Sequence, residues 1–459
     1  MFSLREIAEL CDGKIVAKDS DVLLTGFAID SREVRAGDLF VAFQGAHVDG
    51  HDFIHVAFRN GARAALVEHE IPGVFPLVVV PHVLTALQNL ARTHRKSFNL
   101  PVVCVTGSCG KTTTKECLGI ALSRAFRVRT GFRNWNNELG VPLNLLNLKR
   151  DDECLVLELG AGKAGDIAFL ADLAKPNVGV LTGVHPVHLN GFSNLDGVYE
   201  GKLELADEVN RNGGMMIVNG DDPELVNRMK LRGGTFLTYG KNKSCNFFLS
   251  NLLIEDGVIS FQVNQKHCFR LRGYGEFNAM NALAAIAAAA YYKIDLDELS
   301  KLWCALPTIE KRFQRTLLHG FDIELIDDSY NANPYSVQEA FSSFLNVSRG
   351  RRRIVVFGDM LELGTDSLRY HEDVGRMIAK SDVTMLIGVG EMAAHAVTIY
   401  QNSVSESSGI QVMSVREAAS VLLPQLLAGD SVLIKGSHGT HLFELKSLLE
   451  KGIVAPAAI

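Results

Sequence analysis

Short apolar runs of strand length alternate with helix-like segments along most of the chain. Between residues 100 and 220, such runs occur at 102–106, 154–159, 178–181 and 215–219. After Arg312 the alternation restarts, with apolar runs at 323–327, 354–357, 384–388, 410–415 and 431–434. Strands that alternate with helices are typical of parallel sheets with crossover helices. The pattern therefore predicts an α/β protein whose two later sheets are largely parallel.

Changes in this pattern divide the chain into three parts. Up to about Val80, apolar runs alternate with glycine turns, whereas from Pro101 strands alternate with helices. Domains commonly hold about 150 residues, so a chain of this length suits three of them. We expect an N-terminal domain at 1–98, a central domain at 99–311 and a doubly wound domain at 312–459. The segment 235–271 is rich in β-branched and aromatic residues and is expected to append antiparallel strands to the central domain.

Charge and cysteine content exclude several classes of protein. A net charge of −6 gives no general attraction for nucleic acid, so we expect no nucleic-acid partner, and the basic run 351–353 is expected to be a solvated turn. The eight cysteines are dispersed without a C-x-x-C pair, which disfavours a zinc site or a disulfide scaffold and indicates a reducing cytosol. The first ten residues carry charges where a signal peptide would be apolar, and the most apolar segment, 279–292, is too short to span a bilayer. We therefore expect a cytoplasmic protein without membrane insertion.

The sequence 102–114, VVCVTGSCGKTTT, places Gly-Lys-Thr directly after a β-branched run. A strand that enters a glycine loop and then a helix directs backbone N–H groups and the helix dipole at one point, which suits a phosphate group. In such a loop Lys111 can reach the β- and γ-phosphate oxygens, and the Thr112 hydroxyl is placed to hold Mg²⁺. The sequence therefore predicts a nucleotide-binding loop followed by a helix.

Three features of this loop qualify the prediction. Val105 stands where the usual phosphate loop has a further glycine, so the loop is short, which argues against a GTPase-like switch protein. A chance Gly-Lys-Thr in a surface turn is the alternative, but the preceding strand and the helical run 112–126 disfavour it. A helix N-terminus can lower the pKa of a thiol such as that of Cys109, although a small residue tolerated in the loop is the favoured interpretation.

Other polar residues are candidates for chemistry, and each also has a plain structural interpretation. Glu158 ends an apolar run, where it is either a metal-binding carboxylate or a solvent-facing acid. A loop histidine such as His188 is more often a surface group, and a helix lysine such as Lys202 is normally a solvated charge. Asn278 and Asn281 lie near the start of a helix, where they read a purine edge or, by default, cap the helix.

The segment 327–336, DDSYNANPYS, crowds polar groups between a strand and a helix. Pro334 suits the first turn of a helix, so the preceding asparagines can cap that helix and also present amides to a ligand. Two further strand ends, 357–364 and 434–438, place acids, a lysine and small residues along the same rim. Because ligands of such sheets bind at the carboxyl ends of strands, these segments are expected to converge on one cleft.

Several strings in this chain occur together in one known family. They are DSREVRAGDLFVAF at 30–43, DGHDF at 49–53, TGSCGKTTTK at 106–115, NWNNELGVP at 134–142, ELGAG at 158–162 and DDSYNANP at 327–334. Together they resemble the Mur ligase family of ATP-dependent amide-forming enzymes over nearly the whole chain. The string at 327–334 resembles the branch that adds D-alanyl-D-alanine to UDP-N-acetylmuramoyl-tripeptide.

The resemblance implies a three-domain architecture and a reaction. The N-terminal domain would hold the uridine diphosphate, the central domain would be a parallel-sheet ATPase with a phosphate loop, and the C-terminal Rossmann-like domain would close over ATP and present the dipeptide. In cytoplasmic peptidoglycan precursor synthesis, the terminal carboxylate of the tripeptide would attack the γ-phosphate of ATP to give an acyl phosphate. The amine of D-alanyl-D-alanine would then displace phosphate. We expect the enzyme to be a monomer.

The resemblance also implies roles for particular residues. Catalytic roles fall to Lys111, Glu158, His188 and Lys202. Nucleotide contacts fall to Gly107, Ser108, Cys109, Gly110, Lys111, Thr112, Thr113, Asn278, Asn281, Arg312 and Asp328. Mg²⁺ ligands would be Thr112, Glu158, His188 and Lys202, the last as a carbamate formed with CO₂. Substrate contacts fall to Ser31, Arg32, Gly45, Asp49, His51, Asn134, Asn136, Asn137, Tyr330, Asn331, Asn333 and Ser336.

The chain departs from the family pattern at a few positions, and rival functions remain. Phe277 stands where a histidine is usual, Lys311 where a glycine is common, His438 where an arginine is common, and the segment 162–164 also differs. Ligases of the same design that add the third stem residue, or glutamates to folate, are disfavoured by the two asparagines of 331–333. A non-catalytic ATP-binding protein is disfavoured by the retained catalytic set, and a P-loop kinase would have no use for the N-terminal domain.

Overall fold

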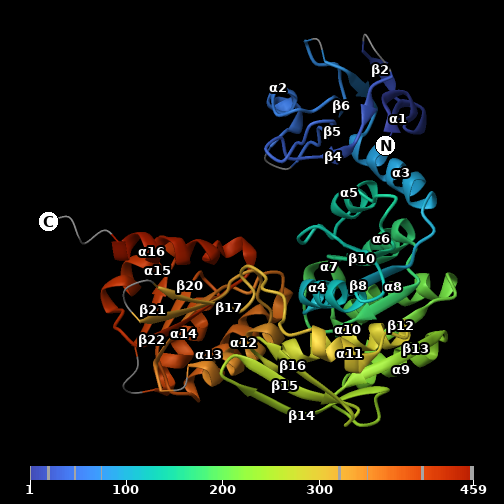
Figure 1. The fold of residues 1–459 in the computed structure, drawn as a ribbon. Coiled ribbons are helices and arrows are strands. Elements are labelled where there is room, and N and C mark those ends of the chain that lie inside the picture. Colours follow the sequence, from blue (N-terminus) through green and yellow to red (C-terminus); the bar gives the residue numbers. More distant parts are fainter. Residues whose placement is uncertain are drawn as a thin grey trace.

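The computed structural model describes residues 2–17, 21–45, 48–73, 75–318, 322–348, 350–404 and 408–454. Met1 and Ile459, the outer limits of the predicted domains, lie outside the described residues. The described chain forms sheets of five, nine and six strands and a small pair, β1 (Phe2–Ser3) with β3 (Leu23–Leu24). The predicted α/β class is confirmed (Figure 1).

The first sheet is built from the N-terminal part of the chain. Its order is β2 (Lys14–Val16), β7 (Leu77–Val79), β6 (Ala64–Val67), β5 (Asp38–Val41) and β4 (Gly26–Ala28). The last four strands are parallel and β2 is an antiparallel edge. Helices α1 (Leu4–Leu10), α2 (Ile54–Arg59) and α3 (Val83–Lys96) accompany it. The apolar face of α3 joins a core that continues into the second sheet, because Leu87 and Leu90 share that core with Leu145 and Leu170.

The second sheet has β8 (Val102–Thr106) near its centre. Its remaining strands are β9 (Val128–Thr130), β10 (Cys154–Glu158), β11 (Val178–Leu181), β12 (Met215–Asn219), β13 (Thr235–Gly240), β14 (Phe247–Glu255), β15 (Val258–Val263) and β16 (His267–Arg272). The strands from β9 to β14 pair in parallel, and β14, β15 and β16 pair antiparallel. The antiparallel prediction for 235–271 is therefore wrong for β13, which extends the parallel part of the sheet.

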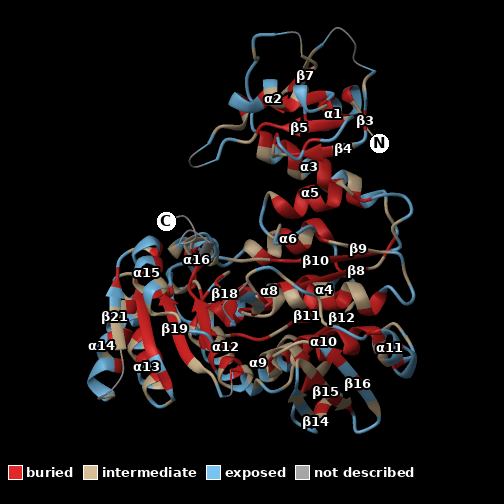
Figure 2. Ribbon diagram, turned by 60° about the vertical axis from the view of Figure 1, so that its left-hand side comes forward, coloured by how far each residue is buried: buried red, intermediate tan, exposed pale blue. Residues whose placement is uncertain are grey.

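Helices cover both faces of this sheet, which explains why its strands are apolar throughout. The helices are α4 (Lys111–Leu122), α5 (Gly140–Leu146), α6 (Asp166–Ala174), α7 (Leu189–Phe192), α8 (Leu195–Arg211), α9 (Pro223–Arg232), α10 (Glu276–Tyr291) and α11 (Leu296–Leu302). Along β8, Val102 and Cys104 enter the core on the side of α6 and α8, whereas Val103 and Val105 enter the core on the side of α4 and α10. Strands buried on both faces read as continuous apolar runs. Figure 2 shows these central strands as buried.

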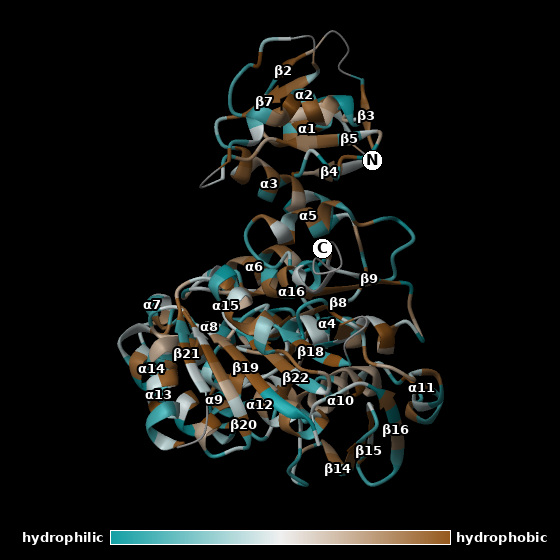
Figure 3. Cartoon of the chain, turned by 90° about the vertical axis from the view of Figure 1, so that its left-hand side faces the viewer, coloured by the Kyte–Doolittle hydropathy of each residue, from teal (hydrophilic) through white to brown (hydrophobic). Residues whose placement is uncertain are grey.

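The third sheet belongs to the C-terminal part of the chain. Its order is β17 (Gln314–Leu318), β18 (Ile323–Asp328), β22 (Asp430–Lys435), β19 (Arg352–Gly358), β20 (Val383–Val389) and β21 (Ser408–Val412). Only β17 runs antiparallel to its neighbour among these described strands. The helices are α12 (Pro334–Val347), α13 (Ser367–Ala379), α14 (Ala393–Ser403), α15 (Val415–Leu422) and α16 (Leu445–Val454). Figure 3 shows hydrophobic strands at the centre of this sheet.

The structure corrects two expectations for the C-terminal part. The strand expected at 410–415 ends at Val412, because the Ser414 side chain accepts a hydrogen bond from the Glu417 amide and so caps α15. The basic run 351–353 is not a solvated turn: Arg353 lies in β19 with 7% of its surface exposed and pairs with Asp382.

The first sheet lies at one end of the molecule, and the third lies beside the second (Figures 1 and 2). The predicted boundary near Asn99 falls between α3 and β8, and the one at residue 311 falls between α11 and β17. Both boundaries stay predictions. None of the helices described has the length and apolar character to cross a bilayer.

Candidate active site

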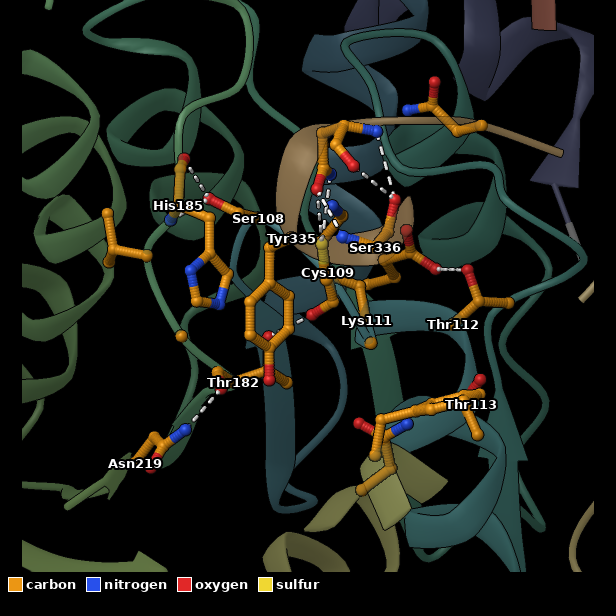
Figure 4. A pocket seen from close by; sticks show the side chains of 18 of the residues that line it. Ser108, Cys109, Lys111, Thr112, Thr113, Thr182, His185, Asn219, Tyr335 and Ser336 are labelled. Carbon is orange, nitrogen blue, oxygen red and sulfur yellow. Dashed lines mark hydrogen bonds between the residues drawn. The ribbon is translucent and has the colours of Figure 1, made fainter. Parts of the chain in front are cut away.

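A cavity of about 810 Å³ lies between the second and third sheets. Its wall includes most of the residues predicted for the site. These are Ser108, Cys109, Gly110, Lys111, Thr112, Thr113, Asn136, Asn137, Glu158, His188, Asn278, Asn281, Arg312, Asp328, Tyr330, Asn331, Asn333 and Ser336. Several of them appear in Figure 4, with the phosphate loop facing α12. The carboxyl ends of β8, β10, β18 and β22 thus meet at one cleft, as expected.

The phosphate loop joins the end of β8 to the start of α4 at Lys111. Gly107 has a φ of 146° and Gly110 has a φ of 80°, which are left-handed conformations that favour glycine. A Cβ at Gly107 would overlap the Thr182 side chain, and one at Gly110 would overlap the Asn281 amide. The two glycines therefore let the loop backbone pass close to its neighbours.

Lys111 and Cys109 occupy this loop with different chemistry. Lys111 Nζ donates a hydrogen bond to the Gly107 carbonyl at 2.8 Å, and burial lowers its pKa. The Cys109 thiol accepts a hydrogen bond from Asn333 Nδ2 at 3.0 Å, and burial raises its pKa. A raised pKa leaves the thiol protonated, so the loop cysteine is not an activated nucleophile.

Glu158 is buried at the end of β10, with 3% of its surface exposed. The Thr112 hydroxyl donates to its Oε2 at 2.8 Å, and Asn136 Nδ2 donates to its Oε1 at 2.7 Å. The alternative of a solvent-facing acid is therefore wrong. A buried carboxylate beside a threonine hydroxyl is a set of hard oxygen donors that suits Mg²⁺.

The donor chemistry fits a magnesium ion that is shared with phosphate groups. Within the described residues, no group of three or more His, Cys, Asp or Glu side chains is arranged to hold a metal ion. Mg²⁺ usually binds through one or two carboxylates, substrate phosphates and water rather than in an all-protein cage. Thr112 and Glu158 beside the phosphate loop match that mode of binding.

His188 lies at the N-terminus of α7 with a left-handed φ of 50°. Its Nδ1 hydrogen-bonds to the Glu362 carboxylate from the loop after β19. The Leu189 amide also donates to the Glu362 carbonyl oxygen at 2.8 Å. Burial lowers the pKa of His188, and the Glu362 carboxylate opposes that shift. With Nδ1 engaged, Nε2 is the ring nitrogen that remains to bind a metal.

Lys202 is not the solvated charge expected of a helix lysine. It lies on α8 with 1% of its surface exposed, 5.4 Å above the Phe192 ring, and its Nζ is 3.5 Å from the Ala161 carbonyl oxygen. Burial, assisted by the charge of Lys111, lowers its pKa to about 7. A large fraction of the amine is therefore neutral near pH 7, and only a neutral amine reacts with CO₂.

Neither asparagine of the pair at 278 and 281 caps α10, so the default interpretation is wrong. The N-cap of α10 is Gly275. Asn278 Nδ2 donates to the Tyr274 carbonyl at 2.8 Å, and Asn281 Oδ1 accepts from Thr114 at 3.2 Å. Asn281 therefore faces the phosphate-loop helix, and both residues border the cavity.

The C-terminal wall of the cavity is formed by the segment before α12. Asn333 caps α12 through the Ser336 amide at 2.8 Å and also contacts the phosphate loop, so both of its expected roles are possible at once. The Arg312 guanidinium lies 3.8 Å from the centre of the Tyr330 ring, and Tyr330 also hydrogen-bonds to Asn134. These contacts join the third sheet to the loop that carries Asn136.

Three residues without a predicted individual role, Lys435, Tyr335 and His185, also line the cavity. Lys435 at the end of β22 pairs with Asp328 at 2.7 Å and donates to the Asn331 carbonyl at 2.6 Å. The Tyr335 ring stacks on His185 with centroids 3.6 Å apart (Figure 4). Lys435 ends an apolar run, and this position in the sequence could have indicated a functional lysine. No local pattern indicates the stacking of His185 on Tyr335, because the two residues are far apart in the sequence.

A separate group of predicted residues lies on the first sheet and outside the cavity. It comprises Ser31, Arg32, Gly45, Asp49 and His51, which follow the carboxyl ends of β4 and β5. His51 Nδ1 bonds to Asp49 at 2.6 Å, its Nε2 accepts from the Glu68 amide at 3.0 Å, and Arg32 pairs with Asp30 at 2.6 Å. Gly107, Asn134 and Lys202 also lie outside the cavity lining, although each contacts residues beside it.

Three of the departures from the family pattern, Phe277, Lys311 and His438, also lie near the cavity. Phe277 borders it and packs against Phe313 with ring centroids 6.1 Å apart. Lys311 Nζ lies 4.0 Å from the centre of the Phe443 ring, on which His438 stacks at 5.2 Å. The two departures Lys311 and His438 therefore share one aromatic neighbour.

Comparisons with known proteins agree over the length of the chain. Residues 24–95 match the profile described as the Mur ligase family catalytic domain, residues 105–289 the Mur ligase middle domain, and residues 311–438 the Mur ligase glutamate ligase domain. UDP-N-acetylmuramoyl-tripeptide--D-alanyl-D-alanine ligase of Bacillus subtilis is 29% identical, with 98% of each chain covered. The enzyme of the same name from Buchnera aphidicola of Acyrthosiphon pisum is 31% identical, with 96% of each chain covered.

Solved structures give the same relationship. MurF from Acinetobacter baumannii has a TM-score of 0.83 at 28% identity, covering 98% of this chain and 99% of its own. MurF ligase from Thermotoga maritima, solved in complex with ADP, has a TM-score of 0.78 at 30% identity, covering 96% and 100%. MurC from Thermotoga maritima, at 16% identity and a TM-score of 0.59, shares the fold alone. With relatives of more than 30% identity along nearly its full length, the chain belongs to the Mur ligase family.

Proposed function

We propose that this protein joins D-alanyl-D-alanine to the terminal carboxylate of UDP-N-acetylmuramoyl-tripeptide and uses ATP to do so. The names of the full-length relatives support this activity. The observation that carries it is the shared cavity that is lined by the phosphate loop, Glu158, Asn331 and Asn333. A nucleotide site and a polar site on another sheet thereby border the same space.

ATP solves the chemical problem of making an amide from a carboxylate, whose leaving group would otherwise be oxide. The tripeptide carboxylate attacks the γ-phosphorus, which forms an acyl phosphate and releases ADP. The dipeptide amine then attacks the acyl carbon, phosphate leaves, and the amine loses a proton. Lys111 and the loop N–H groups neutralise charge on the transferring phosphoryl group, which is the main catalytic contribution in such reactions.

The phosphate loop and Glu158 form the wall of the cavity that belongs to the second sheet, which we call the central wall. Its residues fit a bound Mg²⁺. Thr112, Glu158 and His188 would hold it, and when bound it would neutralise charge on the phosphoryl oxygens. Burial and a lowered pKa support a carbamate on Lys202, formed when the neutral amine binds CO₂ and releases a proton. Asn136 orients Glu158 by its hydrogen bond to Oε1.

The remaining substrate sites are assigned from the positions of the predicted residues. The carboxyl edge of the first sheet, with Ser31, Arg32, Gly45, Asp49 and His51, would hold the uridine diphosphate. A second cavity of about 240 Å³ adjoins the first and shares His188, Tyr330, Asn331 and Asn333 with it. Its lining mixes apolar side chains with amides, which suits a dipeptide of two alanines, and the shared residues mark where amine and acyl phosphate would meet.

The proposal includes three domain roles and a cellular setting. Residues 1–98 would bind the nucleotide-linked substrate, 99–311 would bind ATP, and 312–459 would present the dipeptide. The enzyme would act as a monomer in the cytoplasm, because the cavity is completed by one chain and the dispersed free cysteines suit a reducing compartment.

Product formation tests this proposal directly. Purified protein with Mg²⁺, ATP, UDP-N-acetylmuramoyl-tripeptide and D-alanyl-D-alanine should release ADP and phosphate and give a product whose mass equals tripeptide plus dipeptide minus water. Diaminopimelate and lysine forms of the tripeptide form two arms of the assay. Turnover with single amino acids, and none with the dipeptide, would instead identify a sister ligase; no turnover with any amine would overturn the proposal.

A further inference from the structure

Lys115 is a buried cation for which the proposed reaction has no direct use. Its side chain is fully buried on α4, one turn after Lys111. Its ammonium donates to the carbonyls of Gly131 and Arg133 at 2.6 and 2.7 Å and pairs with Glu116 at 2.8 Å. The three N–H groups of the ammonium therefore have three acceptors. Burying an ammonium is costly unless it is fully bonded in this way, so the position has a specific requirement.

The two carbonyls belong to the loop 131–139 between β9 and α5. This loop presents Asn134, Asn136 and Asn137 toward the cleft, where Asn136 bonds to Glu158 and Asn134 bonds to Tyr330. Arg133 has a left-handed φ of 48°, a conformation that a non-glycine residue adopts only when its surroundings hold it there. The hydrogen bond from Lys115 to the Arg133 carbonyl helps to keep the residue in this conformation.

Hydrogen bonds of Thr112, Asn136 and Lys115 connect Glu158, the helix α4 and the loop 131–139 to one another. On one side, Thr112 of α4 donates to Oε2 at 2.8 Å; on the other, Asn136 donates to Oε1 at 2.7 Å. Lys115 joins these two sides, because it stands three residues after Thr112 on the same helix and binds the loop that carries Asn136. A shift of the loop relative to α4 would therefore move one of the two donors to Glu158.

We propose that Lys115 is a positioning residue that fixes the loop 131–139 relative to the phosphate-loop helix. The asparagines of this loop, Asn134, Asn136 and Asn137, are thereby placed to contact the acyl substrate beside the bound phosphates. This inference rests on the proposed function for the identity of that substrate. Removing the ammonium would leave two buried carbonyls without a donor and release the loop. The phosphate loop itself is held by hydrogen bonds from Ser108 to the carbonyls of Gly183 and His185, which do not involve Lys115.

The chain offers a matched control for a buried cation that binds carbonyls. Arg95 on α3 has 8% of its surface exposed and donates to the carbonyls of Ala174 and Phe98 at 2.9 and 2.7 Å, away from the cavity. Lys115→Met and Arg95→Met each remove a buried cation, so both should lower the unfolding temperature. Only Lys115→Met should change how the acyl substrate binds.

Two measurements separate a positioning role from a structural one. The first is steady-state kinetics: Lys115→Met should raise the KM for the UDP-linked substrate about tenfold or more while the KM for ATP changes less than about twofold, and Arg95→Met should leave both unchanged. The second is acrylamide quenching of tryptophan fluorescence. Trp135 lies in the loop and is half-buried, whereas Trp303 has 2% of its surface exposed and is shielded from the quencher. Quenching should increase in Lys115→Met and not in Arg95→Met.

The outcomes distinguish this inference from the proposed function. If the wild-type protein made no product, the proposed function would fail, and quenching would still decide whether Lys115 holds the loop. Equal quenching in Lys115→Met and wild type, or equal rises in both KM values, would overturn the inference. Should Lys115→Met fail to fold, Lys115→Gln, which keeps a shorter donor, provides the same comparison with an intermediate expected effect.

Discussion

The cavity has two walls that are each held by their own hydrogen bonds, and side-chain contacts between residues far apart in the sequence join the walls across a seam. In the central wall, Glu158 is bonded on both sides and Lys111 is bonded to its own loop. In the C-terminal wall, Lys435 and Asp328 form a buried ion pair. Contacts across the seam include Asn333 with Cys109, Arg312 with Thr112 at 3.5 Å, Asn134 with Tyr330, the ring stack of His185 and Tyr335, and His188 with Glu362.

This contrast separates two kinds of functional residue. Residues within a wall are prearranged, so their removal should change the chemical step itself. Residues at the seam bring prearranged walls together, so their removal should change how often the complete site exists. An enzyme with three substrates can use such a seam to admit them and then close around them. Variants of the two kinds should therefore differ in size of effect and in which kinetic constant responds.

Lys111→Ala tests the central wall and should have the largest effect. Without the ammonium, charge on the transferring phosphoryl group loses its protein-borne countercharge, and phosphate release from ATP with both other substrates present should fall about a thousandfold or more. The measurement is coupled detection of phosphate. Lys149→Ala, which removes an exposed lysine of the same domain, serves as the control and should keep full activity. Near-normal turnover in Lys111→Ala would remove the phosphate loop from the mechanism.

Lys202 tests the same wall through a different group. Lys202→Ala should lower activity about a hundredfold, bicarbonate should not restore it, and short carboxylic acids should restore part of it by placing a carboxylate in the vacated space. Lys202→Met fills that space without a reactive amine and should not be rescued. Carbon-13 NMR of protein equilibrated with labelled CO₂ should show a carbamate signal in the wild type that both variants lack. Full activity in Lys202→Ala would make this lysine a structural residue.

Local sequence predicted much of the central wall because its elements are local. The apolar run of β8, two glycines and the start of α4 occupy adjacent positions, and the strands at 102–106, 178–181 and 215–219 are confirmed. Burial on both faces makes such strands continuous apolar runs, which are easy to recognise. The strand β21 ends earlier than the predicted residue 415 because Ser414 caps the next helix, and a cap competes directly with the extension of a strand.

The seam was much harder to predict from sequence because its partners are distant along the chain. His188 and Glu362 are 174 residues apart, and Cys109 and Asn333 are 224 residues apart. The burial of Lys202 likewise depends on Phe192 and on the packing of α8, neither of which shows in the local pattern of a helix lysine. The resemblance to a family identified such positions, whereas spacing along the chain did not.

Glu362→Ala tests the seam and should have an intermediate effect. The carboxylate fixes His188 through Nδ1 and reaches it only when the two walls meet, so its loss should lower kcat about tenfold and raise the Mg²⁺ concentration needed for half-maximal activity. ATP binding to the central wall should stay nearly unchanged. Glu391→Ala, at an exposed glutamate in the turn between β20 and α14, is the matched control. Loss of ATP affinity without a change in Mg²⁺ dependence would place Glu362 outside the seam.

Acidic pH should weaken the seam at the stack of His185 and Tyr335, with the smallest effect of the four. Burial lowers the pKa of His185 to about 4, whereas an exposed histidine has a pKa of about 6.5. Between these values the exposed or unfolded form binds more protons than the folded form, so the free energy of unfolding should fall as the pH falls from about 6.5 toward 4. From pH 7 to pH 5 the contribution of this group should be about 1–2 kcal/mol.

His185→Phe separates this titration from the packing of the ring. The phenyl ring can still stack on Tyr335, but it binds no proton, so the loss of stability between pH 7 and pH 5 should be smaller in the variant than in the wild type. Urea unfolding at the two pH values measures the difference. An equal loss in both proteins would show that the acid sensitivity arises elsewhere. A smaller loss in the variant would show that protonation of His185, a residue of the seam, destabilises the folded protein at acidic pH.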